Sequence, residues 1–211
     1  MIHLVPIACA AVLAAPVLLM GAGAPARADD AACRDRFVKL LVGGKASKEP
    51  VRIHATQTYA GNTTESYFHS AGRDSGDGMM EPLKNMGQMW VLFRDRKMYT
   101  STDGGKSWKF GRELDAASDP KVTKARLAED SASAANTVCG EEALDGVTHD
   151  TTEGEYVSSL MQGAKVFHKY WVNAGTGWIS KTETRSTAAG NESIAIQVLE
   201  PAPGFEFPKV E

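Results

Sequence analysis

The stretch "VFHKYWVNAGTGWISKTE", residues 166–183, decides the fold of this chain. Its first half places apolar side chains on both faces of a strand, namely Val166, Tyr170 and Val172 on one face and Phe167 and Trp171 on the other. Such a strand must be covered on both sides. We expect helices to cover one side, and either a ligand or the opposite wall of a strongly curved sheet to cover the other. The following segment, residues 173–177, has the composition of a hairpin turn.

Alternation of apolar and polar residues continues on both sides of this hairpin. Residues 51–59 ("VRIHATQTY") alternate and then reverse into a second strand, and residues 88–101 contain a tight reversal at Arg94-Asp95-Arg96. Residues 191–200 ("NESIAIQVLE") follow a turn at Ala189-Gly190-Asn191. We expect seven or more antiparallel strands with two helical interruptions and no β-α-β alternation, which is an α+β fold.

Two segments have helical spacing instead. Near the N-terminus an apolar stripe ends at two glycines, Gly43 and Gly44, and its members are Cys33, Phe37, Leu40 and Leu41. In the middle of the chain Asp119 before Pro120 is a typical helix start. The second helix would have a thin apolar face made of Val122, Ala125 and Leu127.

The first 28 residues have the pattern of a secretory signal peptide. An apolar run from Leu4 to Ala24 precedes a small-residue site, Ala26-Arg27-Ala28, and prolines and glycines interrupt the run. We therefore expect cleavage after Ala28, no stable membrane span after cleavage, and one domain over residues 29–211 in the periplasm or outside the cell. The formal net charge of −3 gives no support for nucleic-acid binding.

Two cysteines, Cys33 and Cys139, follow the predicted signal peptide. In an oxidising compartment a single disulfide is the expected arrangement, and two buried free thiols are the alternative. The enclosed loop is long, so the bond would stabilise the fold by about 4 kcal/mol in the chain-entropy description.

"STDGGKSWKF", residues 101–110, matches the Asp-box of sialidases at Ser101, Asp103, Gly105, Ser107 and Trp108. A sialidase propeller needs several such blades, and this chain has one copy. We interpret the motif as a structural hairpin and rank a glycan-active protein third among the functions. The chain lacks the common motifs of catalysis, so we expect no enzyme, no cofactor and no metal site.

Methionine is concentrated in "DGMMEPLKNMGQMW", residues 77–90. The glycines and Pro82 predict a loop or flap before a strand. Three interpretations stay open: a loop folded onto the core, a mobile lid over an apolar ligand, and a thioether copper site.

Two hairpins resemble the LolA/LolB-like superfamily of periplasmic lipoprotein carriers and lipid-binding domains. "KMYTSTDGGKSWKF" is similar to its hairpin with Gly-Gly-Lys and Trp, and "VFHKYWVNAGTGWISKTE" is similar to its segment W-[IV]-D-x-x-T-G-[LW]-[PI]-x-[KR], with Asn173 in place of the usual Asp. The resemblance implies a strongly curved antiparallel sheet, an incomplete barrel, with helices on its concave side. Arg52 is a loose candidate for the functional strand arginine of the carriers.

The resemblance also implies a ligand: a lipid, an acyl chain or another hydrophobic small molecule, or a lipoprotein, held in the concavity without catalysis. The residues expected to line or close the site, each of which could instead be ordinary core, are Phe68, Met80, Met89, Trp90, Tyr99, Trp108, Phe167 and Trp171. The alternative function is a filled module that recognises or senses an envelope protein.

Overall fold

The computed structural model describes residues 31–44, 49–72, 75–84, 87, 89–188 and 190–210. The predicted signal peptide, residues 1–28, lies outside these ranges. No helix within them is long and apolar enough to cross a membrane.

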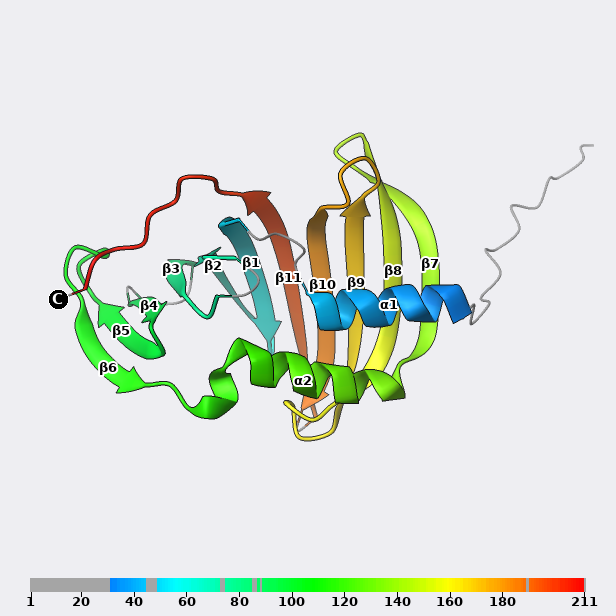
Figure 1. Cartoon of the computed structure of the whole chain (residues 1–211), viewed down its shortest axis with the longest axis horizontal. Helices are drawn as coiled ribbons and strands as arrows, with labels where there is room; N and C mark the ends of the chain where they lie inside the picture. The colour runs from blue at the N-terminus through cyan, green and yellow to red at the C-terminus, as the bar shows by residue number, and fades with distance from the viewer. Residues whose placement is uncertain are drawn as a thin grey trace, which may run out of the picture.

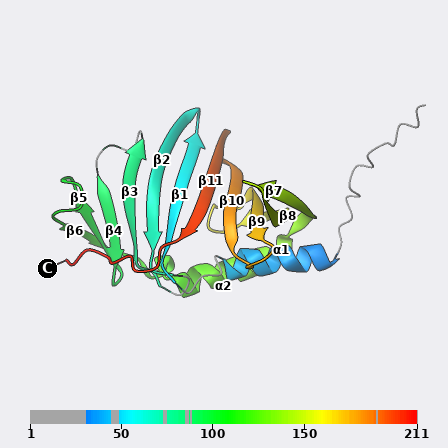
Figure 2. The ribbon, with the colours of Figure 1, turned by 90° about the horizontal axis from the view of Figure 1, so that it is seen from above.

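The described strands form one antiparallel sheet of eleven, in the order β6-β5-β4-β3-β2-β1-β11-β10-β9-β8-β7 (Figures 1 and 2). Hairpins join most neighbours, and the long-range pairing of β1 with β11 unites the two halves. The strands are β1 (Val51–Tyr59), β2 (Asn62–Ser70), β3 (Gly78–Lys84), β4 (Trp90–Arg94), β5 (Lys97–Ser101), β6 (Lys109–Glu113), β7 (Ala135–Leu144), β8 (Val147–Ser158), β9 (Ala164–Asn173), β10 (Ile179–Ala188) and β11 (Asn191–Pro201).

Two α-helices, α1 (Ala31–Gly43) and α2 (Pro120–Asp130), lie against the same face of this sheet, which we call the helix face (Figure 1). The opposite side is the outer face. The Asp119 side chain accepts a hydrogen bond from the Lys121 backbone N–H at 2.8 Å, so it caps α2 as the sequence predicts. The structure confirms the predicted α+β class, with a curved, unclosed antiparallel sheet and helices on one side.

The main core lies between α1 and strands β8 to β10. Phe37 is fully buried, and its ring meets Tyr170 edge to face with centroids 6.2 Å apart. A Cβ on Gly154 would come within 3.0 Å of the Phe37 ring, so the helix approaches this closely only because β8 has a glycine here. The buried members of this cluster are Phe37, Leu41, Ala134, Tyr156, Val166, Tyr170, Val172 and Ile179.

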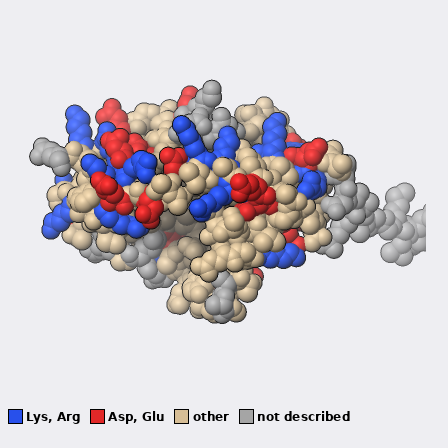
Figure 3. Space-filling view, turned by 60° about the horizontal axis from the view of Figure 1, so that its bottom comes forward, with Lys and Arg blue, Asp and Glu red and all other residues tan. Residues whose placement is uncertain are grey.

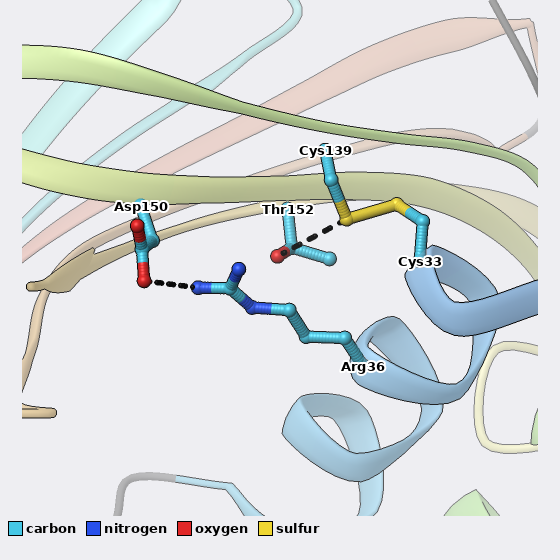
Figure 4. The surroundings of a disulfide bond; sticks show 5 residues. All are labelled: Cys33, Arg36, Cys139, Asp150 and Thr152. Atoms are coloured by element: carbon cyan, nitrogen blue, oxygen red, sulfur yellow. Dashed lines mark hydrogen bonds and ion pairs between the residues drawn. A yellow bond between two sulfur atoms is a disulfide. The ribbon is translucent and has the colours of Figure 1, made fainter. Parts of the chain in front are cut away.

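A disulfide between Cys33 and Cys139 fastens α1 to the edge strand β7, as predicted (Figure 4). The Thr152 hydroxyl lies 3.8 Å from the Cys139 sulfur. On the same side of α1, the Arg36 guanidinium donates to the Asp150 carboxylate on β8 at 2.8 Å. A covalent bond and an ion pair thus orient the helix across the sheet.

The structure corrects two local predictions. Residues 78–84 form strand β3 instead of a loop, with Met79 buried. Pro82 is tolerated because β4 pairs only with Gly78 to Met80, so beyond Met80 the β4-facing side of β3 needs no backbone donor. On α2, Leu127 faces the sheet as predicted, but Val122 and Ala125 are exposed and Thr123 faces inward in their place.

The C-terminal segment, residues 202–210, which we call the strap, crosses the outer part of the sheet (Figure 1). The Phe205 ring stacks on the His69 ring at 4.2 Å between centroids. The Arg94 guanidinium donates to the Pro208 carbonyl at 2.8 Å. Strands β2 and β4 are therefore held together by the end of the chain.

Candidate ligand-binding cavity

A cavity of about 810 Å³ lies between the helices and the middle of the sheet. This volume is within the usual range of ligand sites, roughly 300 to 1,000 Å³. Its walls come from the end of α1, the first two turns of α2 and the β2–β3 loop, and its floor comes from β1 and β8 to β11. The lining residues include Leu41, Val42, Val51, Pro120, Lys121, Thr123, Lys124, Leu127, Tyr156, His168, Tyr170, Ile179, Thr182 and Gln197.

The floor of the cavity carries a polar stripe among apolar walls. The His168 ring stacks on Tyr170 at 4.8 Å between centroids, and one of its nitrogens lies 3.0 Å from the Thr184 hydroxyl. Across the β10–β11 pair, the Thr182 hydroxyl donates to the Gln197 side-chain oxygen at 3.5 Å. The floor can therefore face the hydroxyl, ester or ether groups of a ligand whose chain rests on the apolar walls.

The described titratable groups around the cavity include bases and phenols but no carboxylate. Among the described lining residues there are two lysines, two tyrosines and one histidine, and no carboxylate. Burial raises the pKa of both Tyr156 and Tyr170, so both phenols stay protonated at neutral pH. Lys121 and Lys124 are exposed. The cavity thus suits an uncharged or anionic amphipathic molecule better than a cation.

Helix α2 forms one wall without being fully packed. None of its side chains is buried, and its apolar residues along the cavity are Pro120 and Leu127, beside Thr123. A helix that does not fill the space beneath it leaves that space for a ligand. The thin apolar face of α2 is consistent with this open space, and of its predicted members Leu127 lines the cavity whereas Val122 and Ala125 do not.

None of the eight predicted ligand residues lines this cavity. Phe68 and Met80 are paired on the helix face, where Phe68 packs on a small cluster of Val51, Ile53 and Leu199. By register the outer face carries Trp90, Tyr99, Phe167 and Trp171. Met89 is exposed before β4, and Trp108 is half-buried near Trp90 beside Gly105. A ligand role for these eight stays a prediction.

The outer face of β9 is covered by long charged side chains. The ammonium groups of Lys169 and Lys181 lie 4.8 Å and 4.5 Å from the Trp171 ring centre. The Trp171 indole N–H donates to Glu142 at 2.7 Å, and the Arg185 guanidinium lies over Phe167. Cation–π contacts and aliphatic stems thus provide the second cover that the apolar strand requires.

The Asp-box motif forms a closed hydrogen-bonded turn between β5 and β6. The Asp103 carboxylate accepts hydrogen bonds from the Ser101 and Ser107 hydroxyls and from the backbone N–H groups of Lys106 and Ser107. These donors, the Ser107 hydroxyl first, hold the pKa of Asp103 below its usual range. All of them come from its own hairpin, which agrees with the structural interpretation of the motif.

The predicted arginine of the carriers lies away from the cavity. Arg52 is on the outer face, where its guanidinium pairs with Glu200 at 2.6 Å and lies over the Tyr67 ring. Four of the histidines lie in strands, namely His54, His69, His149 and His168. Of these, His168 alone contributes to the cavity.

No protein-family pattern matches the sequence, and no curated protein sequence is similar to it. Among solved structures, LprF from Mycobacterium bovis matches 83% of this chain and 96% of its own, with 13% identity and a TM-score of 0.53. A LolA superfamily protein from Nitrosomonas europaea (9% identity, 83% and 94% coverage) has a TM-score of 0.35. A putative outer membrane lipoprotein-sorting protein domain from Vibrio parahaemolyticus (10% identity, 82% and 92% coverage) has a TM-score of 0.34.

The likeness to LprF concerns the fold alone, since only 13% of residues are identical. The match covers 96% of LprF, so the likeness concerns the arrangement of the whole fold and is not limited to one hairpin. The LolA-like fold implied by the two sequence hairpins is thereby confirmed. The TM-scores of the other two structures are too low to support an argument.

Proposed function

We propose that this chain is an exported, non-catalytic protein that binds one lipid or similar amphipathic molecule between the sheet and helices α1 and α2. The 810 Å³ cavity is the observation that carries the proposal. Its walls are apolar, its floor is polar in part, and its described lining contains no carboxylate. Burying each methylene of an acyl chain there would contribute about 0.8 kcal/mol.

The Cys33–Cys139 disulfide supports export, because such bonds persist in oxidising compartments. It agrees with the signal-peptide pattern of residues 1–28. We therefore propose a periplasmic or secreted protein whose folded part begins near α1.

The proposal is tested by native mass spectrometry of the exported protein, purified without detergent, followed by solvent extraction of any bound molecule. We expect an adduct of defined mass that extraction removes. An apo mass that stays unchanged when phospholipids and fatty acids are added would contradict the proposal and favour a protein-recognition module.

A matched pair of variants on α2 locates the site. Thr123 lines the cavity, whereas its neighbour Val122 points to solvent with 36% of its surface exposed. Thr123→Trp should fill the cavity and reduce ligand occupancy at least tenfold, because an indole occupies space that the ligand needs. Val122→Trp should leave occupancy unchanged. Equal occupancy in both variants would place the ligand elsewhere.

A further inference from the structure

Three hairpin turns at one end of the sheet carry no charge. They are the β1–β2 turn with its flanks (56–64, "TQTYAGNTT"), the β8–β9 turn (157–164, "VSSLMQGA") and the described part of the β10–β11 turn (186–188, "STA", and 190–191, "GN"). The three runs come from distant parts of the sequence.

The strand register shows that these turns lie at the same end of the sheet. One lateral row of paired residues crosses five adjacent strands: Tyr156, Val166, Ser186, Ser193 and Tyr59. All of these residues are uncharged, and the three turns lie just beyond the row. In Figure 3, where this end of the molecule is brought forward, a mostly uncharged lobe projects below a band crowded with charged side chains.

The turns present apolar side chains to solvent. Leu160 and Met161, at the tip of the β8–β9 turn, are 40% and 39% exposed, and Val157 beside them is 46% exposed. Tyr59 at the β1–β2 turn is 47% exposed. A tyrosine combines an apolar ring with a polar hydroxyl and is enriched where apolar and aqueous phases meet.

The β8–β9 turn is pinned so that its tip points outward. The Ser159 N–H donates to the Asp130 carboxylate at the end of α2, and the Val157 N–H donates to the Ser133 hydroxyl, both at 2.9 Å. These bonds hold the base of the turn against the helix end. Leu160 and Met161 therefore stay at the surface in this conformation.

The opposite end of the sheet is different. The β7–β8 turn contains Asp145, and the end of the β1–β11 pair carries the exposed Arg52–Glu200 ion pair. Val147, at that end of β8, is as exposed as Val157 at the other end. The β9–β10 turn at this end (173–178, "NAGTGW") is uncharged as well, so the charge of this end comes from Asp145, Arg52 and Glu200.

We propose that the uncharged end formed by these three turns docks on the surface of a lipid bilayer. Charged side chains are strongly disfavoured in the hydrocarbon region, and these turns contain none. Four partly exposed side chains are a small contact compared with the roughly 800 Å² that each partner of a stable protein interface buries. Inserting a few apolar side chains is enough for reversible binding to a bilayer surface.

This inference rests on the proposed function, because a lipid-binding cavity must exchange its ligand with a lipid phase. The nearest charged residues have both signs. Lys165 lies opposite Val157 at the base of the β8–β9 turn and pairs with Glu155, and Glu192 lies opposite Thr187 at the base of the β10–β11 turn. Docking should therefore depend on apolar insertion, with little contribution from attraction to anionic headgroups.

The test is co-sedimentation of the exported protein with phosphatidylcholine vesicles. We expect binding that persists at high salt, and at least a tenfold loss of bound protein in the double variant Leu160→Asp, Met161→Asp. The matched control is Val147→Asp, which places one carboxylate on the same strand at the opposite end and should bind like the wild type.

Three outcomes would overturn the proposal: no vesicle binding by the wild type, an equal loss in the control, or binding abolished by salt. Circular dichroism melting of each variant checks that the loss does not reflect unfolding. Vesicle binding and ligand mass are separate readouts. If the protein carries a ligand but does not bind vesicles, the docking proposal fails and the proposed function stands. If no ligand is found, vesicle binding can still be measured on its own.

Discussion

The two halves of the sheet are stabilised in different ways. Helix α1 lies over strands β7 to β10, and a cluster of eight buried apolar residues around Phe37 fills the space between the helix and strands β8 to β10. On the helix face of the other half, the described buried cluster consists of Val51, Ile53 and Leu199. At its far edge every residue of β6 is exposed. Helix cover therefore decides where the sheet has a large core.

Local contacts replace the missing helix in the second half. The Asp103 turn closes the β5–β6 hairpin, and the C-terminal strap joins β2 to β4 through His69 and Arg94. Such contacts stabilise the fold less than a buried apolar cluster does, and their contribution to stability depends more on pH. We expect the half under α1 to unfold last and the β4–β6 region to open first.

The largest expected effect is on Phe37. Phe37→Ala should lower the free energy of unfolding by about 3 to 5 kcal/mol, because it leaves a cavity in the main core. Phe110→Ala on β6 should change it by about 0.5 kcal/mol or less, because 57% of the Phe110 surface is already exposed. Urea denaturation of both variants measures the difference, and equal losses would refute the contrast between the halves.

The disulfide should have the next largest effect. Replacing Cys33 and Cys139 together by serine should destabilise the protein by about 2 to 4 kcal/mol, because the bond closes a loop between residues 106 positions apart. Hydrogen exchange should show faster opening of α1 and β7, with β4 to β6 nearly unchanged. Faster exchange confined to β4–β6 would contradict this account.

A smaller, pH-dependent effect is expected at the strap. Burial lowers the pKa of His69 below its ordinary value, with a further contribution from Arg52, while Glu81 at 3.5 Å opposes the shift. The unfolded or released state then binds the proton more readily, so this stabilisation is present above about pH 6.5 and is lost as the pH falls through the folded pKa. The melting temperature should therefore decrease on acidification.

His69→Gln separates this effect from general acid denaturation. The variant should show a flatter pH dependence than the wild type between about pH 5 and 7, and hydrogen exchange of residues 202–208 should no longer respond to acid. An unchanged pH profile in the variant would show that His69 is not the responsible group.

The smallest global effect is expected at the Asp103 turn. Asp103→Asn should open the turn and increase hydrogen exchange at Lys106 and Ser107, because an amide oxygen accepts fewer and weaker bonds than the carboxylate. The wild-type turn should itself weaken only at strongly acidic pH, since the lowered pKa keeps the carboxylate ionised until then. Unchanged hydrogen-exchange protection at both amides would show that the Asp103 carboxylate does not hold the turn closed.

Much of the fold could be predicted because it depends on neighbouring residues. The alternation of apolar and polar residues predicted the strands of the β9–β10 hairpin, and the pair Asp119-Pro120 predicted the start of α2. The prediction for residues 78–84 was wrong because Pro82 and the glycines suggested a loop. A proline is acceptable in a strand that lacks a partner on one side, and only the pairing with β4 reveals that.

The candidate site could be predicted only in part. The sequence placed Leu41 and Leu127 on apolar helix faces, and both line the cavity. It did not indicate that Thr182 and Gln197 line the cavity, because the alternation of polar and apolar residues around them is the same as in any strand with one solvated face. The aromatic residues chosen for their size are mostly distributed over the outer face and the far half of the sheet.

By itself, the sequence determined most of the strands and turns and favoured the pairing of Cys33 with Cys139, because periodicity, turn chemistry and a count of two cysteines after the predicted signal peptide are local or compositional facts. The tertiary structure decided the location of the cavity and the uncharged end. Both depend on which residues of distant strands lie opposite each other, as Tyr59 lies opposite Ser193. That register is fixed by packing across the whole sheet, with α1 and α2 on one face.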